Sequence, residues 1–94
     1  MNKYETIFIM KNDITEEQKN KIIFTIKNYL NEKGKITKEQ DLGQKKLAYE
    51  CKTYKEGKYY SIEFDAESEA IRELERIYRI NSDILKFIVV RNDN

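Results

Sequence analysis

The fold of this chain is decided around one stretch, Leu42-Gly43-Gln44-Lys45-Lys46-Leu47-Ala48-Tyr49, which lies inside a longer strand-like segment. A strand interior tolerates glycine poorly unless the chain bends, bulges or approaches another group closely, so Gly43 predicts a kink. Lys45 and Lys46 place two positive charges beside that kink, where a partner can lie. We find no enzyme motif with this arrangement, and the stretch therefore favours a binding role.

Outward from this stretch, the chain alternates between strand and helix patterns. Residues 36–51 form one long, interrupted strand candidate, and residues 54–57 supply a turn that makes a hairpin with the next strand. The other elements expected from periodicity are a strand over 4–10, a helix over 15–34, a strand over 59–64, a helix that begins at 68 and ends at 81–83, and a strand over 84–91.

Four residues predict how the helices begin and end. Thr15 and Gln18 are spaced as a capping box, in which each side chain bonds the other residue's backbone N–H. Gly34 is well placed to end the first helix in a left-handed conformation. Ser68 is a plausible cap for the second helix.

The order strand, helix, strand, strand, helix, strand predicts an α+β fold, the ferredoxin-like β-α-β-β-α-β sandwich. Right-handed crossovers place both helices on one face of a four-stranded antiparallel sheet. The opposite face, which we call the open face, would carry Ile7, Ile9, Tyr59, Lys86, Ile88 and Val90. An exposed apolar and basic patch of this kind is a binding-site candidate, and the alternative is that ordinary strand propensity leaves such residues exposed.

Length and charge limit the classes of protein that this chain can be. Its 94 residues suffice for one domain, and we predict a single domain over residues 1–94. Lysines and arginines number 18 and acids 17, so global charge does not drive polyanion binding, although a local basic edge can still contact phosphates. The sequence has no membrane-spanning apolar run and its N-terminus does not resemble a signal peptide, so we expect a cytoplasmic protein.

The residue types argue against catalysis and metal binding. Cys51 is the only cysteine and histidine is absent, which removes a thiolate cluster and the commonest general base. The carboxylates of the second helix are spaced for surface ion pairs, with Glu73 three residues before Arg76 and Glu75 four before Arg79. We therefore expect no enzyme, no cofactor and no metal.

The RNA-recognition motif has the same topology, but its aromatic signature is not matched here. Gly57 is followed by Lys58 rather than an aromatic residue, and Glu63 stands where the last aromatic residue belongs. The alternation also turns Phe8 and Tyr60 toward the helices. Reading of single strands by base stacking on the sheet is therefore not expected.

Several motifs together resemble the family of the sixth protein of the bacterial small ribosomal subunit. They are Gly43 to Lys52, the N-terminal Met1-x-x-Tyr4-Glu5, Gly57-x-Tyr59-Tyr60, and Ile84 to Arg91. The resemblance covers essentially the whole chain. It implies a non-enzymatic protein of the cytoplasmic ribosome that binds the central domain of small-subunit ribosomal RNA together with the eighteenth small-subunit protein. It also implies the ferredoxin-like fold.

Charge placement then predicts the RNA contacts, which are Lys3, Tyr4, Lys45, Lys46, Lys86 and Arg91. Lys3 and Tyr4 open the first strand and Arg91 ends its antiparallel neighbour, so these residues should lie close together and contact phosphates. The apolar Leu47, Ala48 and Tyr49 are the predicted contacts for the partner protein. For each lysine the alternative is a solvated cation, and for each tyrosine it is packing.

Other functional classes stay open at this point. A free ferredoxin-like module that binds a small ligand or self-associates through its open face is the main alternative. A phosphate-hydrolysing relative is more distant, because the chain shows no glycine-rich phosphate loop. Since the net charge is small, we expect weak RNA affinity alone and tighter, salt-sensitive binding beside a basic partner.

Overall fold

The structure, a computed structural model, describes residues 1–51 and 54–92, and the side chains of all of these except residues 48–51. Within these residues the elements are β1 (Asn2–Lys11), α1 (Glu16–Lys33), β2 (Gly34–Cys51), β3 (Tyr54–Ala66), α2 (Glu69–Ile80) and β4 (Ile84–Arg91). The order agrees with the sequence prediction. The extent of the domain, residues 1–94, stays a prediction.

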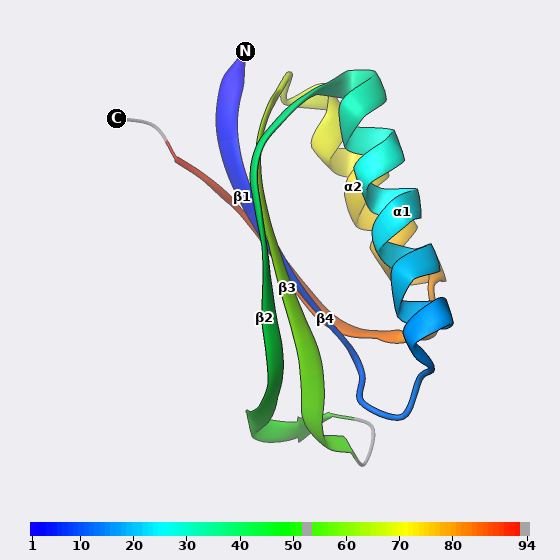
Figure 1. Ribbon diagram of the computed structural model, residues 1–94. Helices are drawn as coiled ribbons and strands as arrows, with labels where there is room; N and C mark the ends of the chain where they lie inside the picture. Colours follow the sequence, from blue (N-terminus) through cyan, green and yellow to red (C-terminus); the bar gives the residue numbers. More distant parts are fainter. Residues whose placement is uncertain (52–53, 93–94) are drawn as a thin grey trace.

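The four strands of the described chain form one antiparallel sheet in the order β2-β3-β1-β4. Both helices lie on the same side of this sheet, while the hairpin of β2 and β3 extends past them at the end opposite the chain termini (Figure 1). This is the predicted ferredoxin-like sandwich. We call the side that packs against the helices the covered face; the other side is the open face.

Alternation along the strands sends one set of side chains into the core between sheet and helices. Phe8 and Met10 of β1 and Ile62 of β3 have no exposed surface, and Leu74 of α2 is equally buried. Full burial of one such side chain stabilises the fold by roughly 1.5–3 kcal/mol. The other large, fully buried side chains are Tyr78, Phe64, Ile26, Leu30 and Thr6.

One buried hydrogen-bond chain joins β1, α2 and β4. The hydroxyl of Thr6 donates to the carbonyl of Ile88 at 2.9 Å, and it lies 2.8 Å from the hydroxyl of Tyr78. Because the proton of Thr6 is already committed to Ile88, Tyr78 is the donor in the second bond. Burial raises the pKa of Tyr78, which keeps the phenol protonated and able to donate.

The helix ends confirm one predicted cap and correct two. The capping box is present, with the Gln18 amide N–H donating to the Thr15 hydroxyl at 3.1 Å and the Thr15 N–H donating to the Gln18 side chain at 2.8 Å. The predicted left-handed cap at Gly34 is wrong, because its φ of −174° is extended. Ser68 makes no side-chain cap, since its backbone is already helical and the hydroxyl cannot reach the N-cap geometry.

Gly34 is needed for a different reason, the close approach of two backbones. It starts β2 opposite Ala66 at the end of β3. A Cβ atom added at Gly34 would collide with the backbone carbonyl of Asp65. Glycine therefore lets β2 begin directly after α1 without pushing the two strands apart.

The hairpin of β2 and β3 is confirmed, but residues 54–57 are not its turn. Residues 54–57 belong to β3, with Gly57 opposite Lys45 and Tyr54 opposite Cys51. The predicted turn was wrong because residues 54–57 hydrogen-bond to β2 as part of a strand. This pairing outweighs the tendency of a glycine beside charged residues to form a turn.

Gly43 does mark an irregularity in β2, as predicted. It has a φ of +79°, and the register slips by one residue between Asp41 and Gly43, which leaves Leu42 as the extra residue of a bulge. The Asp41 carboxylate accepts from the Gly43 N–H at 2.9 Å. The bulge reverses which face of the sheet the following residues of β2 point to.

Two ion pairs bind the edge strand β2 to α1 on the covered face. Lys19 lies 2.6 Å from the carboxylate of Asp41, and Lys27 lies 3.0 Å from that of Glu39, which also accepts from the Tyr60 hydroxyl. The bond from Lys27 lowers the pKa of Glu39, and the bond from Lys19 lowers that of Asp41. Burial, aided by the bond to Glu39, raises the pKa of Tyr60 to about 12.

The outer surfaces of the helices carry many charged side chains, although Phe24 of α1 and Ile80 of α2 are also exposed. Arg76 makes two hydrogen bonds to Glu73, at 2.8 and 2.7 Å, and Arg79 pairs with Glu75 at 3.7 Å. These are the surface ion pairs that the spacing predicts. No helix within the described residues combines the length and apolar character that crossing a membrane requires.

Candidate nucleic-acid and partner interface

The ends of β1 and β4 carry two exposed cations, Lys3 and Arg91, at the same end of the sheet. Tyr4 pairs with Arg91 in the sheet, and the N–H of Asn92 donates to the carbonyl of Lys3 at 2.7 Å. Arg91 donates from its guanidinium to the side chain of Asn2 at 2.9 Å. Lys3 and Arg91 are both exposed, at the end of the sheet that also carries the termini (Figure 1). The two residues are therefore close along the backbone, as predicted, but their side chains point to opposite faces of the sheet, because Arg91 shares the face of its partner Tyr4 and Lys3 does not.

Tyr4 lies between these two residues along the backbone, but its side chain is buried in the core. It is 6% exposed, and its ring stacks on that of Phe64 with 5.5 Å between centroids. Its hydroxyl lies 3.4 Å from the amide nitrogen of Asn2. The structure thus gives Tyr4 the packing role that was the alternative at this position, because a ring buried in the core has no free face for a nucleotide.

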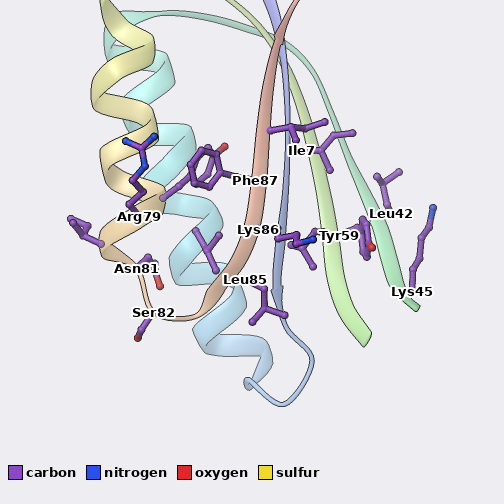
Figure 2. A pocket seen from close by; sticks show the side chains of 15 residues that line it. Ile7, Leu42, Lys45, Tyr59, Arg79, Asn81, Ser82, Leu85, Lys86 and Phe87 are labelled. Carbon is purple, nitrogen blue, oxygen red and sulfur yellow. The ribbon is translucent and has the colours of Figure 1, made fainter. Parts of the chain in front are cut away.

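Lys45 and Lys86 lie on the open face, far from each other in sequence. Lys86 is opposite Ile9 in the sheet, and the Lys45 ammonium lies 5.9 Å from the ring centroid of Tyr59. Both border a groove of about 890 Å³ whose open-face lining also includes Ile7 (Figure 2). The predicted open face is therefore present, and Ile88 and Val90 on it are 54% and 43% exposed.

Lys46 and the residues after it have a different setting. Lys46 is exposed and lies opposite Glu56, on the other side of β2 from Lys45, because neighbouring residues of a strand point to opposite faces. Leu47 is half-buried. The side chains of Ala48 and Tyr49, the other predicted partner contacts, lie outside the described part of the chain.

Arg79 is a cation at the groove that sequence reasoning assigned only to a surface ion pair. Its guanidinium lies 5.8 Å from the ring centroid of Phe87, and it lines the same groove as Lys86. The available signal was its position near the end of the second helix, one turn before the last strand. That position places a long cationic side chain over the edge of the sheet.

The electrostatics of the described residues give no sign of catalytic chemistry. The carboxylates whose pKa is lowered, Glu39, Asp41 and Glu73, each owe the shift chiefly to a hydrogen bond from a lysine or arginine within the fold. Among the described side chains, no group of three histidine, cysteine or acidic residues is arranged to hold a metal ion. The arrangement offers surfaces for binding, made of exposed cations and apolar side chains.

Comparison with known proteins identifies the family. A model of the family described as ribosomal protein S6 matches residues 3–91. This chain belongs to the ribosomal protein S6 family. Small ribosomal subunit protein bS6 of Helicobacter acinonychis (strain Sheeba) is 46% identical to it, over 100% of this chain and 67% of that protein. The bS6 protein of Caldanaerobacter subterraneus subsp. tengcongensis is 36% identical over 100% of both.

A solved structure agrees in fold. The crystal structure of 30S ribosomal protein S6 from Thermotoga maritima matches with a TM-score of 0.92 and 32% identity, covering 97% of this chain and 87% of that chain. The ribosomal protein S6 family is a structural, non-enzymatic part of the bacterial cytoplasmic ribosome. The predictions of family, fold class, non-enzymatic nature and location are therefore confirmed, and this chain is an S6 protein of the small subunit.

Proposed function

We propose that this S6 protein binds the central domain of small-subunit ribosomal RNA together with the eighteenth small-subunit protein. The observation that carries the proposal is the pair of exposed cations, Lys3 and Arg91, which the pairing of β1 with β4 brings to one end of the sheet. Exposed cations at one end of a rigid sheet, one on each face, suit phosphate contacts, which position a protein on RNA without reading its sequence.

Three further lysines extend the proposed RNA surface. Lys45 and Lys86 lie on the open face and Lys46 on the opposite side of β2, all of them exposed. We leave Tyr4 out of the contact set because it is buried against Phe64. Leu47, Ala48 and Tyr49 at the end of β2 stay the proposed contacts for the partner protein.

Titration of an RNA fragment of the central domain tests this proposal. A double variant, Lys3→Gln with Arg91→Gln, should weaken binding and lower the slope of log K against log salt by about two, since each lost phosphate contact lowers it by about one. The matched control is Lys21→Gln with Lys33→Gln, which removes two exposed charges from α1. The proposed contacts are wrong if both double variants bind the RNA equally well.

The same titration with the eighteenth protein present tests the partnership. The net charge of this chain is only +1, so we expect weak binding alone and tighter binding in the presence of a basic partner. Equal affinity with and without the partner would overturn that part of the proposal. A free regulatory module, in contrast, would not co-sediment stoichiometrically with small ribosomal subunits at either low or high salt.

A further inference from the structure

The outer side of β4 is an edge of the sheet that the proposed function does not use. In the order β2-β3-β1-β4, β4 pairs with β1 on one side, and no strand of the described chain pairs with it on the other. An edge strand presents backbone N–H and C=O groups to any chain that lies beside it. Proteins that bind extended peptides often do so by adding the peptide as a strand to such an edge.

The hydrogen bonds of β4 show which of its backbone groups face outward. The carbonyl of Ile88 accepts from the Thr6 hydroxyl, so it points toward β1, where Ile88 lies opposite Ile7. In an antiparallel pair, successive residues alternate between facing the partner strand and facing away. Phe87 and Val89 therefore turn their N–H and C=O groups to the outer edge.

The groove surrounds this edge on both sides. On the covered side Phe87 stacks on Tyr78, with 4.8 Å between ring centroids, next to Ile80, which is 67% exposed. On the open-face side lies Lys86 (Figure 2), together with Ile88, which pairs with Ile7 of that face. Side chains of an added strand alternate between the two faces, so they would enter both parts of the groove.

The charges that line the groove select the partner. Three cations, Lys45, Arg79 and Lys86, border it, and the described residues that line it include no carboxylate. A second copy of this chain paired edge to edge would bring the same cations together, which disfavours self-association. An acidic partner would meet opposite charges on both sides of β4.

The apolar lining favours a polypeptide over RNA at this site. On the open-face side the described lining is aliphatic apart from Tyr59 and the two lysines, and Lys45 already lies over the Tyr59 ring. Unpaired bases bind chiefly by stacking on aromatic rings. Aliphatic side chains of a strand pack well against such a surface.

We propose that the outer edge of β4 binds an extended acidic polypeptide segment, which adds as a fifth strand with apolar side chains in the groove and carboxylates near Arg79 and Lys86. This role goes beyond the proposed RNA binding, because it uses the backbone of Phe87 and Val89; Lys86 is also a proposed RNA contact, so RNA and the acidic segment would compete for it. It assigns the groove to a protein partner defined by its chemistry, an acidic segment with alternating apolar residues.

The probe is a synthetic peptide of alternating valine and glutamate, as long as the eight residues of β4. With the peptide at about ten times its Kd, amide exchange at Phe87 and Val89 should slow by about tenfold, following 1 + [L]/Kd. The amide of Ile88, which faces β1, should change much less. A peptide of alternating valine and lysine is the control. The proposal is overturned if both peptides bind alike, or if neither slows exchange at Phe87 and Val89.

Two variants separate the contribution of the β4 backbone to peptide binding from that of the charged side chains. Val89→Pro removes one outward N–H of β4 and should weaken binding of the acidic peptide. Edge strands tolerate proline at positions whose N–H faces outward. Arg79→Glu with Lys86→Glu leaves the backbone unchanged and should reverse the preference between the two peptides. This second variant tests the proposal even if the proline variant does not fold. An unchanged preference, or an RNA oligonucleotide that protects the same amides more strongly than the acidic peptide, would overturn the proposal.

Discussion

The covered and open faces of the sheet are made by alternating residues of the same strands, yet they are used differently. On β1, Phe8 has no exposed surface while its neighbours Ile7 and Ile9 border an open groove. On β4, Val89 packs against the core while Ile88 is 54% exposed. Similar side chains thus serve packing on one face and remain available for binding on the other.

This difference shows that apolar character alone does not assign a strand residue to the core. The helices cover one face only (Figure 1). Side chains beneath them, such as Phe8 and Thr6, have their packing and hydrogen-bond partners within the chain. The open face keeps isoleucines beside Lys45 and Lys86. Stability should therefore depend on the covered face, and binding should depend on the open face and its edges.

The largest expected effect is the difference in stability loss when a side chain is truncated to alanine on the covered face and on the open face. Phe8→Ala should lower the free energy of unfolding by about 3–5 kcal/mol, because it leaves a cavity in the core. Ile88→Ala should lower it by less than about 1 kcal/mol, since the side chain is already half in water. Urea unfolding monitored by circular dichroism measures both, and comparable losses would show that the open face also carries the fold.

A smaller effect tests the buried hydroxyl of the covered face. Tyr78→Phe removes the bond to Thr6 and should lower the free energy of unfolding by about 1 kcal/mol. Thr6 keeps its bond to the carbonyl of Ile88, so the loss stays modest. The control, Tyr59→Phe on the open face, should change stability by no more than about 0.5 kcal/mol. If the two phenylalanine variants are equally stable, the buried hydrogen bond contributes nothing net.

The smallest effect concerns pH and the ion pairs at the margin of the covered face. The pKa of Glu39 lies below its ordinary value of 4.5 because Lys27 donates to it. Its stabilising contribution is therefore complete above pH 4.5 and is lost as the pH falls through the lowered pKa. Because the pair is more than a third exposed, we expect less than about 1 kcal/mol.

Glu39→Gln tests this contribution directly. The variant should show a flatter dependence of unfolding free energy on pH below 4.5 than the parent, measured by urea unfolding at a series of pH values. At the alkaline end the parent should lose stability as Tyr60 ionises, between its ordinary pKa of 10.0 and its raised value of about 12. Identical acid limbs in variant and parent would contradict the role of Glu39.

Much of the fold could be predicted from local patterns. The alternation of Thr6, Phe8 and Met10, and the capping box of Thr15 and Gln18, depend on neighbouring residues only, and both predictions agree with the structure. The turn and the cap at Gly34 were placed wrongly because they depend on strand pairing. A single sequence does not show that Asp65 lies against Gly34.

The candidate site was predictable where topology alone decides it. Lys3 and Arg91 lie together because antiparallel neighbours place the start of one strand at the end of the other. Arg79 was missed because its approach to Phe87 depends on how α2 crosses β4. The sequence is compatible with Tyr4 as either an RNA contact or a core residue, and only its stacking on Phe64 in the structure decides for the core.

By itself, the sequence determined the order of the elements, the faces of β1, β3 and β4, and the family. Periodicity and capping depend on residues a few positions apart, so they can be predicted from the sequence. Only the tertiary structure decided where Lys45 points. The bulge at Gly43 shifts the register by one residue, and since side chains alternate along a strand, that single slip moves Lys45 to the open face beside Tyr59.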